Sequence, residues 1–221
     1  MSFLLPDAIP PEYAEKAEEV RAYLVQLRGG APFLSAADAR ILIQWFDEGI
    51  STTAILAALD QVSLKRRKKR VRSRLSLSIC KSSLKKVTTN KKRPLTIQKS
   101  NSIHILAQKI ADLNLSPELI SVRNSLTKIL FSIGSKSGDA EENEISSAIS
   151  ACLAFHSQAW ELAESEHEEL HRQAEKELAP LAALLPPIKW RESVEEIMRD
   201  TIRMRYPLIS AKNIWDATNQ T

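Results

Sequence analysis

The spacing of apolar residues predicts helices along most of the chain. Apolar positions recur at steps of three or four, the period of an amphipathic helix, whereas strand-like alternation is confined to a short run near residues 74–79. A first helix is expected after Pro10-Pro11, with its end at Gly29-Gly30, because proline favours helix starts and glycine favours helix ends. Ser35 and Ser51 are suitable N-caps for a second and a third helix. We therefore predict an all-α fold that opens with a small N-terminal three-helix unit.

The second half of the chain contains the longest periodic segment. Helices are predicted over about 101–112 and 116–133, and a final amphipathic helix over about 191–205, followed by a short tail. Between them, a long helix is expected from about 141 to 178 or beyond, with steps of four and three that are typical of a coiled-coil seam. The inner positions of this helix are Ile145, Ile149, Cys152, His156, Ala159, Ala163, His167, Leu170, Ala174, Leu178, Leu181 and Leu185.

The positive charge of the chain is concentrated in one segment. The formal net charge is +4, but residues 61–111 carry 16 Lys or Arg and no Asp or Glu, while the segments on either side are acidic. This contrast suggests three parts: an N-terminal helical module over 1–64, a basic and partly disordered linker or helix extension over 65–100, and a C-terminal helical bundle over 101–221.

A dense cationic segment without internal acid favours a polyanionic partner. Lysine and arginine that contact phosphates release condensed counterions, which drives binding to nucleic acid. We predict a non-enzymatic protein that binds the phosphate backbone of DNA or RNA. The same segment also contains a cationic cluster at Lys81, Lys85 and Lys86, which is not among the predicted contacts. The predicted contact residues are Lys65, Arg66, Arg67, Lys68, Lys69, Arg70, Arg72, Arg74, Lys91, Lys92 and Arg93.

Other interpretations of the same charge remain open. The chain is alternatively a helical adaptor or assembly subunit, whose basic arm binds an acidic protein partner. In either case the 141–185 helix is expected to mediate self-association or the docking of a protein partner. A third interpretation gives the basic segment no ligand: it is a solvated tail, or an arm that neutralises the acidic helices of the chain itself.

Two local resemblances support DNA binding. Residues 42–55 resemble a helix-turn-helix, with Gly49 as the turn glycine and Ile50 and Ile55 as the buried positions. Residues 34–60 also resemble the helical domain of DnaD-type replication-restart proteins, over about 30 residues. That resemblance implies binding of single-stranded or structured DNA. The residues that carry it are Leu34, Ser35, Asp38, Ile41, Trp45, Ile55 and Ala58.

Catalytic and metal-binding motifs give little support to an enzyme. The chain contains no phosphate-binding glycine loop, dinucleotide fingerprint, His-Glu-x-x-His or nucleophile elbow, so we expect no catalysis and no cofactor. Glu164 and Glu168 precede His167 and His171 with the Glu-x-x-His spacing of di-iron bundles, and the two histidines have a spacing that suits zinc. A metal-dependent helical protein is therefore a remote alternative, since both motifs overlap on one helix.

The cysteines and the apolar segments indicate the cellular compartment in which we expect the protein. Cys80 and Cys152 are too few for a disulfide framework or a four-cysteine zinc site, and they are typical of reduced thiols. The first residues lack the pattern of a secretory signal. No stretch approaches the ~20 apolar residues that span a bilayer. We expect a cytoplasmic protein without a membrane partner, nucleoid-associated in a bacterium or nuclear in a eukaryote.

Overall fold

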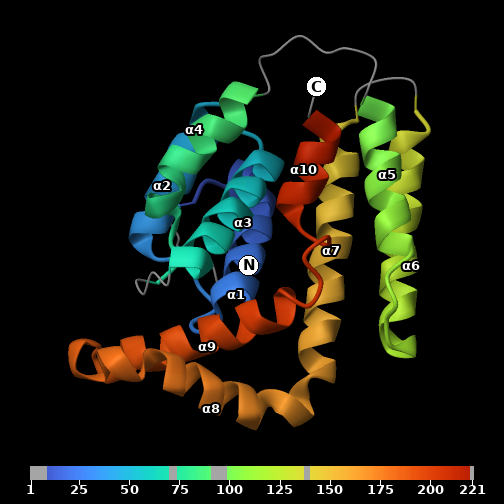
Figure 1. Cartoon of the computed structure of the whole chain (residues 1–221). Coiled ribbons are helices and arrows are strands. Elements are labelled where there is room, and N and C mark those ends of the chain that lie inside the picture. The colour runs from blue at the N-terminus through green and yellow to red at the C-terminus, as the bar shows by residue number, and fades with distance from the viewer. Residues whose placement is uncertain (1–8, 70–73, 91–98, 137–139, 220–221) are drawn as a thin grey trace.

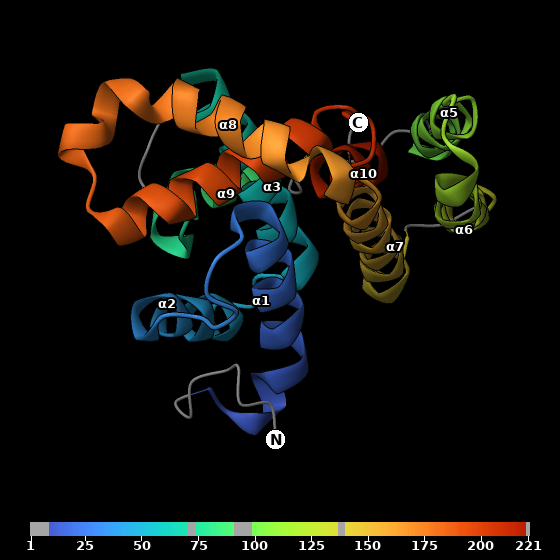
Figure 2. The ribbon, with the colours of Figure 1, turned by 90° about the horizontal axis from the view of Figure 1, so that it is seen from below.

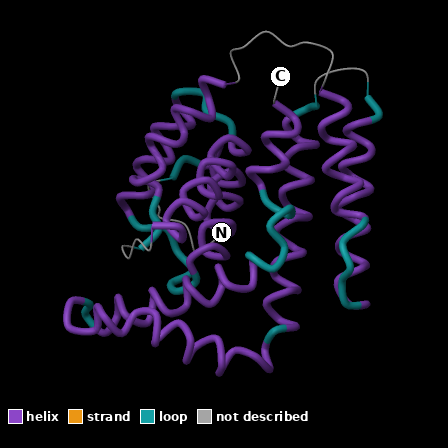
Figure 3. The backbone as a smooth tube through the Cα atoms, viewed as in Figure 1, coloured by secondary structure: helices purple, strands orange, loops and turns teal. Residues whose placement is uncertain are grey.

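The fold is all-α, as the apolar periodicity predicts. The computed structural model describes residues 9–69, 74–90, 99–136 and 140–219, and within these ranges it contains helices and loops but no strand (Figure 3). The α-helices are α1 (Ala14–Arg28), α2 (Ala36–Asp47), α3 (Thr52–Lys69), α4 (Lys81–Asn90), α5 (Lys99–Ala111), α6 (Pro117–Gly134), α7 (Glu142–Leu162), α8 (His167–Leu178), α9 (Pro187–Arg203) and α10 (Ala211–Asn219).

The ends of the first three helices follow from local chemistry. Ser35 Oγ accepts a hydrogen bond from the backbone N of Asp38 at 3.1 Å, and Ser51 Oγ accepts one from Ala54 N at 3.3 Å. Each bond satisfies an N–H group that has no partner inside its helix. Gly29 and Gly49 have φ angles of 64° and 71°, which glycine adopts without a Cβ clash. Helices are present at the three predicted places.

Part of the predicted linker is packed into the core. The short 3₁₀ helix η2 (Leu77–Cys80) follows Leu75 and leads directly into α4. Leu75, Leu77, Cys80, Leu84 and Val87 are all buried against the core. Their spacing from 77 to 87 is that of one helix face, which the surrounding charge and serines obscured. Residues 70–73 and 91–98, which complete the linker prediction, lie outside the described residues.

The predicted long helix is two helices with a bend between them. The helix α7 ends at Leu162, the 3₁₀ turn η3 (Glu164–Glu166) follows, and α8 leaves in a new direction (Figure 1). The bend is held by Arg205, which donates to both carboxylate oxygens of Glu166 at 3.0 and 2.6 Å. The ring of His167 also lies 4.1 Å from the ring of Trp160, between centroids. These contacts form only in the folded chain. The apolar residues keep their steps of four and three through this region, so their spacing did not predict the bend.

The apolar seam of this predicted helix is used inside the molecule. Its α7 positions face α6 and α10, and its α8 positions face α9, the antiparallel partner of α8 (Figure 2). Every seam position from Ile145 to Ala163 is buried, and so are Leu170, Ala174 and Leu178. These buried positions are therefore used for packing within the chain, and self-association or partner docking through the 141–185 segment stays a prediction.

The predicted C-terminal tail is a central helix. The helix α10 packs against α3, α5 and α7 and lies between the N-terminal helices and the α5–α6 pair (Figure 1). Its residues Ala211, Ile214 and Trp215 are buried. The N-terminal and C-terminal helices therefore contribute residues to one apolar core.

A buried ion pair joins the two ends of the chain. Asp60 of α3 is 0% exposed, and its Oδ1 lies 2.5 Å from Arg203 Nη2 of α9. The other carboxylate oxygen accepts a hydrogen bond from Lys212 N, at the start of α10, at 3.1 Å. A charge in a dry interior needs such partners, because the loss of hydration is otherwise uncompensated.

In the parts of the chain that the structure describes, no helix combines enough length with enough apolar residues to cross a membrane.

Candidate nucleic-acid interface

The first half of α3 is buried, and its cationic C-terminal half is partly exposed. Residues 52–60 of α3 are all buried, whereas Lys65 is exposed and Arg67 is half-buried. In a helix-turn-helix, the residues at the start of the second helix contact bases in the major groove. The corresponding residues here pack inside the protein, so α3 cannot act as a recognition helix in this fold. The positive residues lie instead at its C-terminal end, where the helix dipole favours cations.

Two of the predicted phosphate contacts are paired inside the protein. Arg66 is buried, and its Nη2 lies 3.2 Å from Glu196 Oε1 of α9. Arg74 is half-buried, and its Nη1 lies 2.9 Å from Glu192 Oε1 of the same helix. Both guanidinium groups therefore fasten the segment after α3 to α9, and they are not available as open phosphate contacts.

The acids that pair with them form one stripe of α9. Glu192, Glu196 and Asp200 are spaced by four residues and so lie on one face of the helix. Asp200 accepts a hydrogen bond from Ser63 Oγ at 3.2 Å, and Glu196 accepts one from Leu75 N at 3.4 Å. Burial raises the pKa of Glu196 to about 7, against the opposing effect of Arg66. The four-residue spacing of these acids in the sequence could have indicated the acidic face of α9. The net charge of a segment does not indicate it, because the sum ignores which side of the helix each charge occupies.

Within the basic segment 61–111, α4 carries three exposed lysines. Lys81, Lys85 and Lys86 are exposed, while Ser83, Leu84 and Val87 of the same helix are buried. Lys81 and Lys85 are one helical turn apart and therefore lie on the same side of α4. We call the four exposed lysines Lys65, Lys81, Lys85 and Lys86 the lysine face. The helix α4, which carries three of these lysines, runs beside α3 (Figure 1).

Other predicted contact residues are only partly described or lie outside the description. Arg67 lines a small internal cavity together with Asp200 and His156. The backbones of Lys68 and Lys69 belong to α3, but their side chains are outside the described part. The remaining predicted residues outside the described ranges are Arg70, Arg72, Lys91, Lys92 and Arg93.

The histidines considered as metal ligands contact other side chains, and the two thiols are buried. His167 lies against Trp160, and His171 Nδ1 lies 3.5 Å from Glu175. Among the residues that the structure describes, no group of three or more His, Cys, Asp or Glu is arranged to hold a metal ion. Cys80 and Cys152 are buried, and burial raises the pKa of Cys80 to about 12 and also raises that of Cys152. Neither thiol therefore forms the reactive thiolate easily.

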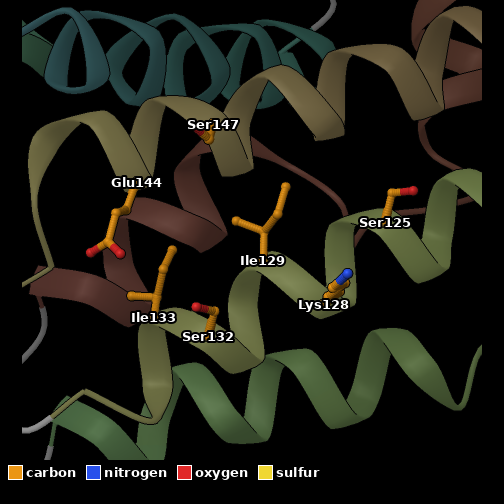
Figure 4. Close-up of a pocket in the computed structure, with 7 residues that line it drawn as sticks. All are labelled: Ser125, Lys128, Ile129, Ser132, Ile133, Glu144 and Ser147. Atoms are coloured by element: carbon orange, nitrogen blue, oxygen red, sulfur yellow. The ribbon is translucent and has the colours of Figure 1, made fainter.

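A second hollow lies between α6 and α7, away from the lysine face. It has a volume of about 500 Å³. Ile129 and Ile133 project from α6 towards α7, and Glu144 and Ser147 belong to the α7 side (Figure 4). Its lining combines serines and aliphatic side chains with Lys128 at the rim, which suits contact with another surface better than proton transfer or nucleophilic chemistry.

Comparison with known proteins adds no relative. The chain matches no protein-family model, no curated protein and no solved structure.

Proposed function

We propose that this protein is a non-enzymatic nucleic-acid-binding protein that contacts the phosphate backbone through the lysine face. The observation that carries the proposal is the exposure of three lysines on one ordered helix, in a segment that has no carboxylate in its sequence from 61 to 111. A folded helix holds its charges in position before binding, so less conformational entropy is lost on association. Contact with phosphates then gains from counterion release.

The proposed phosphate contacts differ from those that the charge of the sequence predicted. Arg66 and Arg74 hold α9 through their ion pairs, while Lys65, Lys81, Lys85 and Lys86 make the contacts. Phosphate contacts position a nucleic acid without reading its bases. The proposed binding is therefore not sequence-specific, and it includes DNA and RNA.

The test replaces the lysines of α4 by glutamine. We expect the K81Q/K85Q/K86Q variant to bind a labelled oligonucleotide about tenfold or more weakly near physiological salt. The slope of log affinity against log salt should fall by roughly 2–3, since each lost phosphate contact removes about 0.9 from it. Fluorescence anisotropy over a salt series measures both quantities.

A matched variant controls for net charge. Lys109, Lys128 and Lys176 are also exposed, but they belong to α5, α6 and α8. Their replacement by glutamine removes the same charge, and we expect a much smaller loss of affinity. Equal losses in the two variants would contradict a defined lysine face.

The alternative function is that of an adaptor, in which the lysine face binds an acidic protein. Polyglutamate serves as the probe for this alternative, because it carries carboxylates without phosphates. If polyglutamate competes as well as a nucleic acid of equal charge at the same salt, the adaptor function is favoured. The nucleic-acid proposal expects it to compete poorly.

A further inference from the structure

The loop between α1 and α2 presents an aromatic ring to solvent from a rigid backbone. Phe33 is 55% exposed. Arg21 Nη1 donates to Pro32 O at 2.5 Å, and Arg28 Nη2 donates to Phe33 O at 3.2 Å. Both arginines are buried residues of α1. Exposure of a large apolar ring on a loop held by two buried guanidinium groups is unfavourable for the isolated protein, since the ring gains nothing from hydration.

The same loop lies against the basic segment that leads to α4. Arg28 also donates from Nη1 to Leu75 O at 3.1 Å, so one guanidinium joins the carbonyl groups of Phe33 and Leu75. At the start of α2, Asp38 accepts a hydrogen bond from Leu77 N at 2.9 Å. These contacts place the Phe33 loop beside the chain that enters α4 at Lys81. Figure 1 shows α2 and α4 on the same side of the molecule.

We infer that Phe33 stacks on an unpaired base of a single-stranded nucleic acid whose phosphates contact the lysine face. The inference rests on the proposed function and adds the preferred form of the ligand. Proteins that bind single strands combine cations along the backbone with aromatic rings on which bases stack, and every base offers a π face. A duplex keeps those faces inside its own stack. Phe33 therefore selects single strands over duplexes, while the lysines bind both.

The test compares Phe33→Ala with the wild type on four ligands: single-stranded DNA, single-stranded RNA, duplex DNA and heparin, which is a polyanion without bases. We expect about tenfold weaker binding to both single strands, because one stacked base contributes a fold-change of this order. Binding to the duplex and to heparin should be unchanged. The salt slope should also be unchanged, since phenylalanine carries no charge. Phe33→Trp should retain the affinity, and base stacking should quench its added fluorescence.

The control is Ile105→Ala, which removes a 46% exposed apolar side chain from α5. We expect it to bind all four ligands like the wild type, and both alanine variants to unfold at the wild-type denaturant concentration. If Phe33→Ala binds single strands as tightly as the wild type, or loses affinity equally for heparin, the inference is overturned and the lysine face stands. If the wild type binds no nucleic acid at all, the proposed function and the inference both fail.

Discussion

At the scale of single residues, burial decides the chemistry of the titratable side chains. His156 Nε2 donates to the backbone O of Ile209 at 2.7 Å, in a fully buried position on α7. Burial, with a smaller effect from Arg203, lowers the pKa of His156 to about 4. The apolar periodicity correctly predicted an inward-facing position for His156. Its partner is 53 residues away in the sequence, so no local pattern identified the hydrogen bond.

The shifted pKa of His156 predicts a loss of stability in acid. Between pH 6.5 and about 4 the unfolded chain takes up a proton at this histidine and the folded chain does not, so the free energy of unfolding falls as the pH falls. The expected loss over this window is about 3 kcal/mol. The His156→Gln variant should lack it, because its amide still donates to Ile209 O and does not titrate.

Urea unfolding of both proteins across this pH range measures the difference directly. Glu196, whose raised pKa acts in the opposite direction, is present in both proteins and cancels in the comparison. Parallel pH profiles for the two proteins would contradict a neutral, buried His156.

At the scale of elements, helix ends that depend on neighbouring residues were predictable, and those that depend on distant residues were not. The caps at Ser35 and Ser51 and the stop at Gly29 involve groups within a few residues, so the chain alone indicates them. The break after α7 depends on Arg205, which is 39 residues from Glu166. The helix α10 has only nine residues, and a helix that short is stable through its packing rather than its propensity.

The two glycines that end α1 and α2 should differ in their tolerance of a side chain. Gly29 has φ 64° and ψ −158°, a region that essentially only glycine occupies, and an added Cβ would lie 2.2 Å from Glu195 Cδ. At Gly49 an added Cβ would meet no atom within 4 Å. We expect Gly29→Ala to lower the free energy of unfolding by about 3 kcal/mol and Gly49→Ala by about 1 kcal/mol. Equal losses in denaturant unfolding would show that the contact with Glu195 is unimportant.

At the scale of the whole molecule, polar contacts across the core hold the N-terminal and C-terminal parts together. Asp60 and Arg203 are separated by 143 residues and form the buried ion pair between α3 and α9. Tyr23 OH accepts a hydrogen bond from Ala211 N at 3.4 Å, which adds α1 and α10 to the same region. Satisfied polar groups of this kind specify one arrangement of helices, because any other would leave them unpaired.

The ion pair predicts a non-additive response to substitution. Asp60→Asn leaves the buried Arg203 with only the more distant carboxylate of Asp200, 3.8 Å away, and we expect it to cost about 3–5 kcal/mol. In the double variant with Arg203→Met both charges of this ion pair are absent, so it should be more stable than Asp60→Asn alone. A double-mutant cycle from chemical unfolding measures the coupling. Losses that simply add would mean that the two side chains act independently.

The sequence by itself determined the all-α class, most helix starts and stops, and a cationic segment without internal acid. These properties depend on residue type and on short spacings, which the chain carries before it folds. Tertiary structure alone decided which cations face solvent. Arg66 pairs with Glu196, 130 residues away, while Lys81 is exposed on α4, and Arg28 joins the carbonyl oxygen of Phe33 to that of Leu75. The reason is that exposure and charge pairing depend on which helices meet, and that is settled by packing of the shared core.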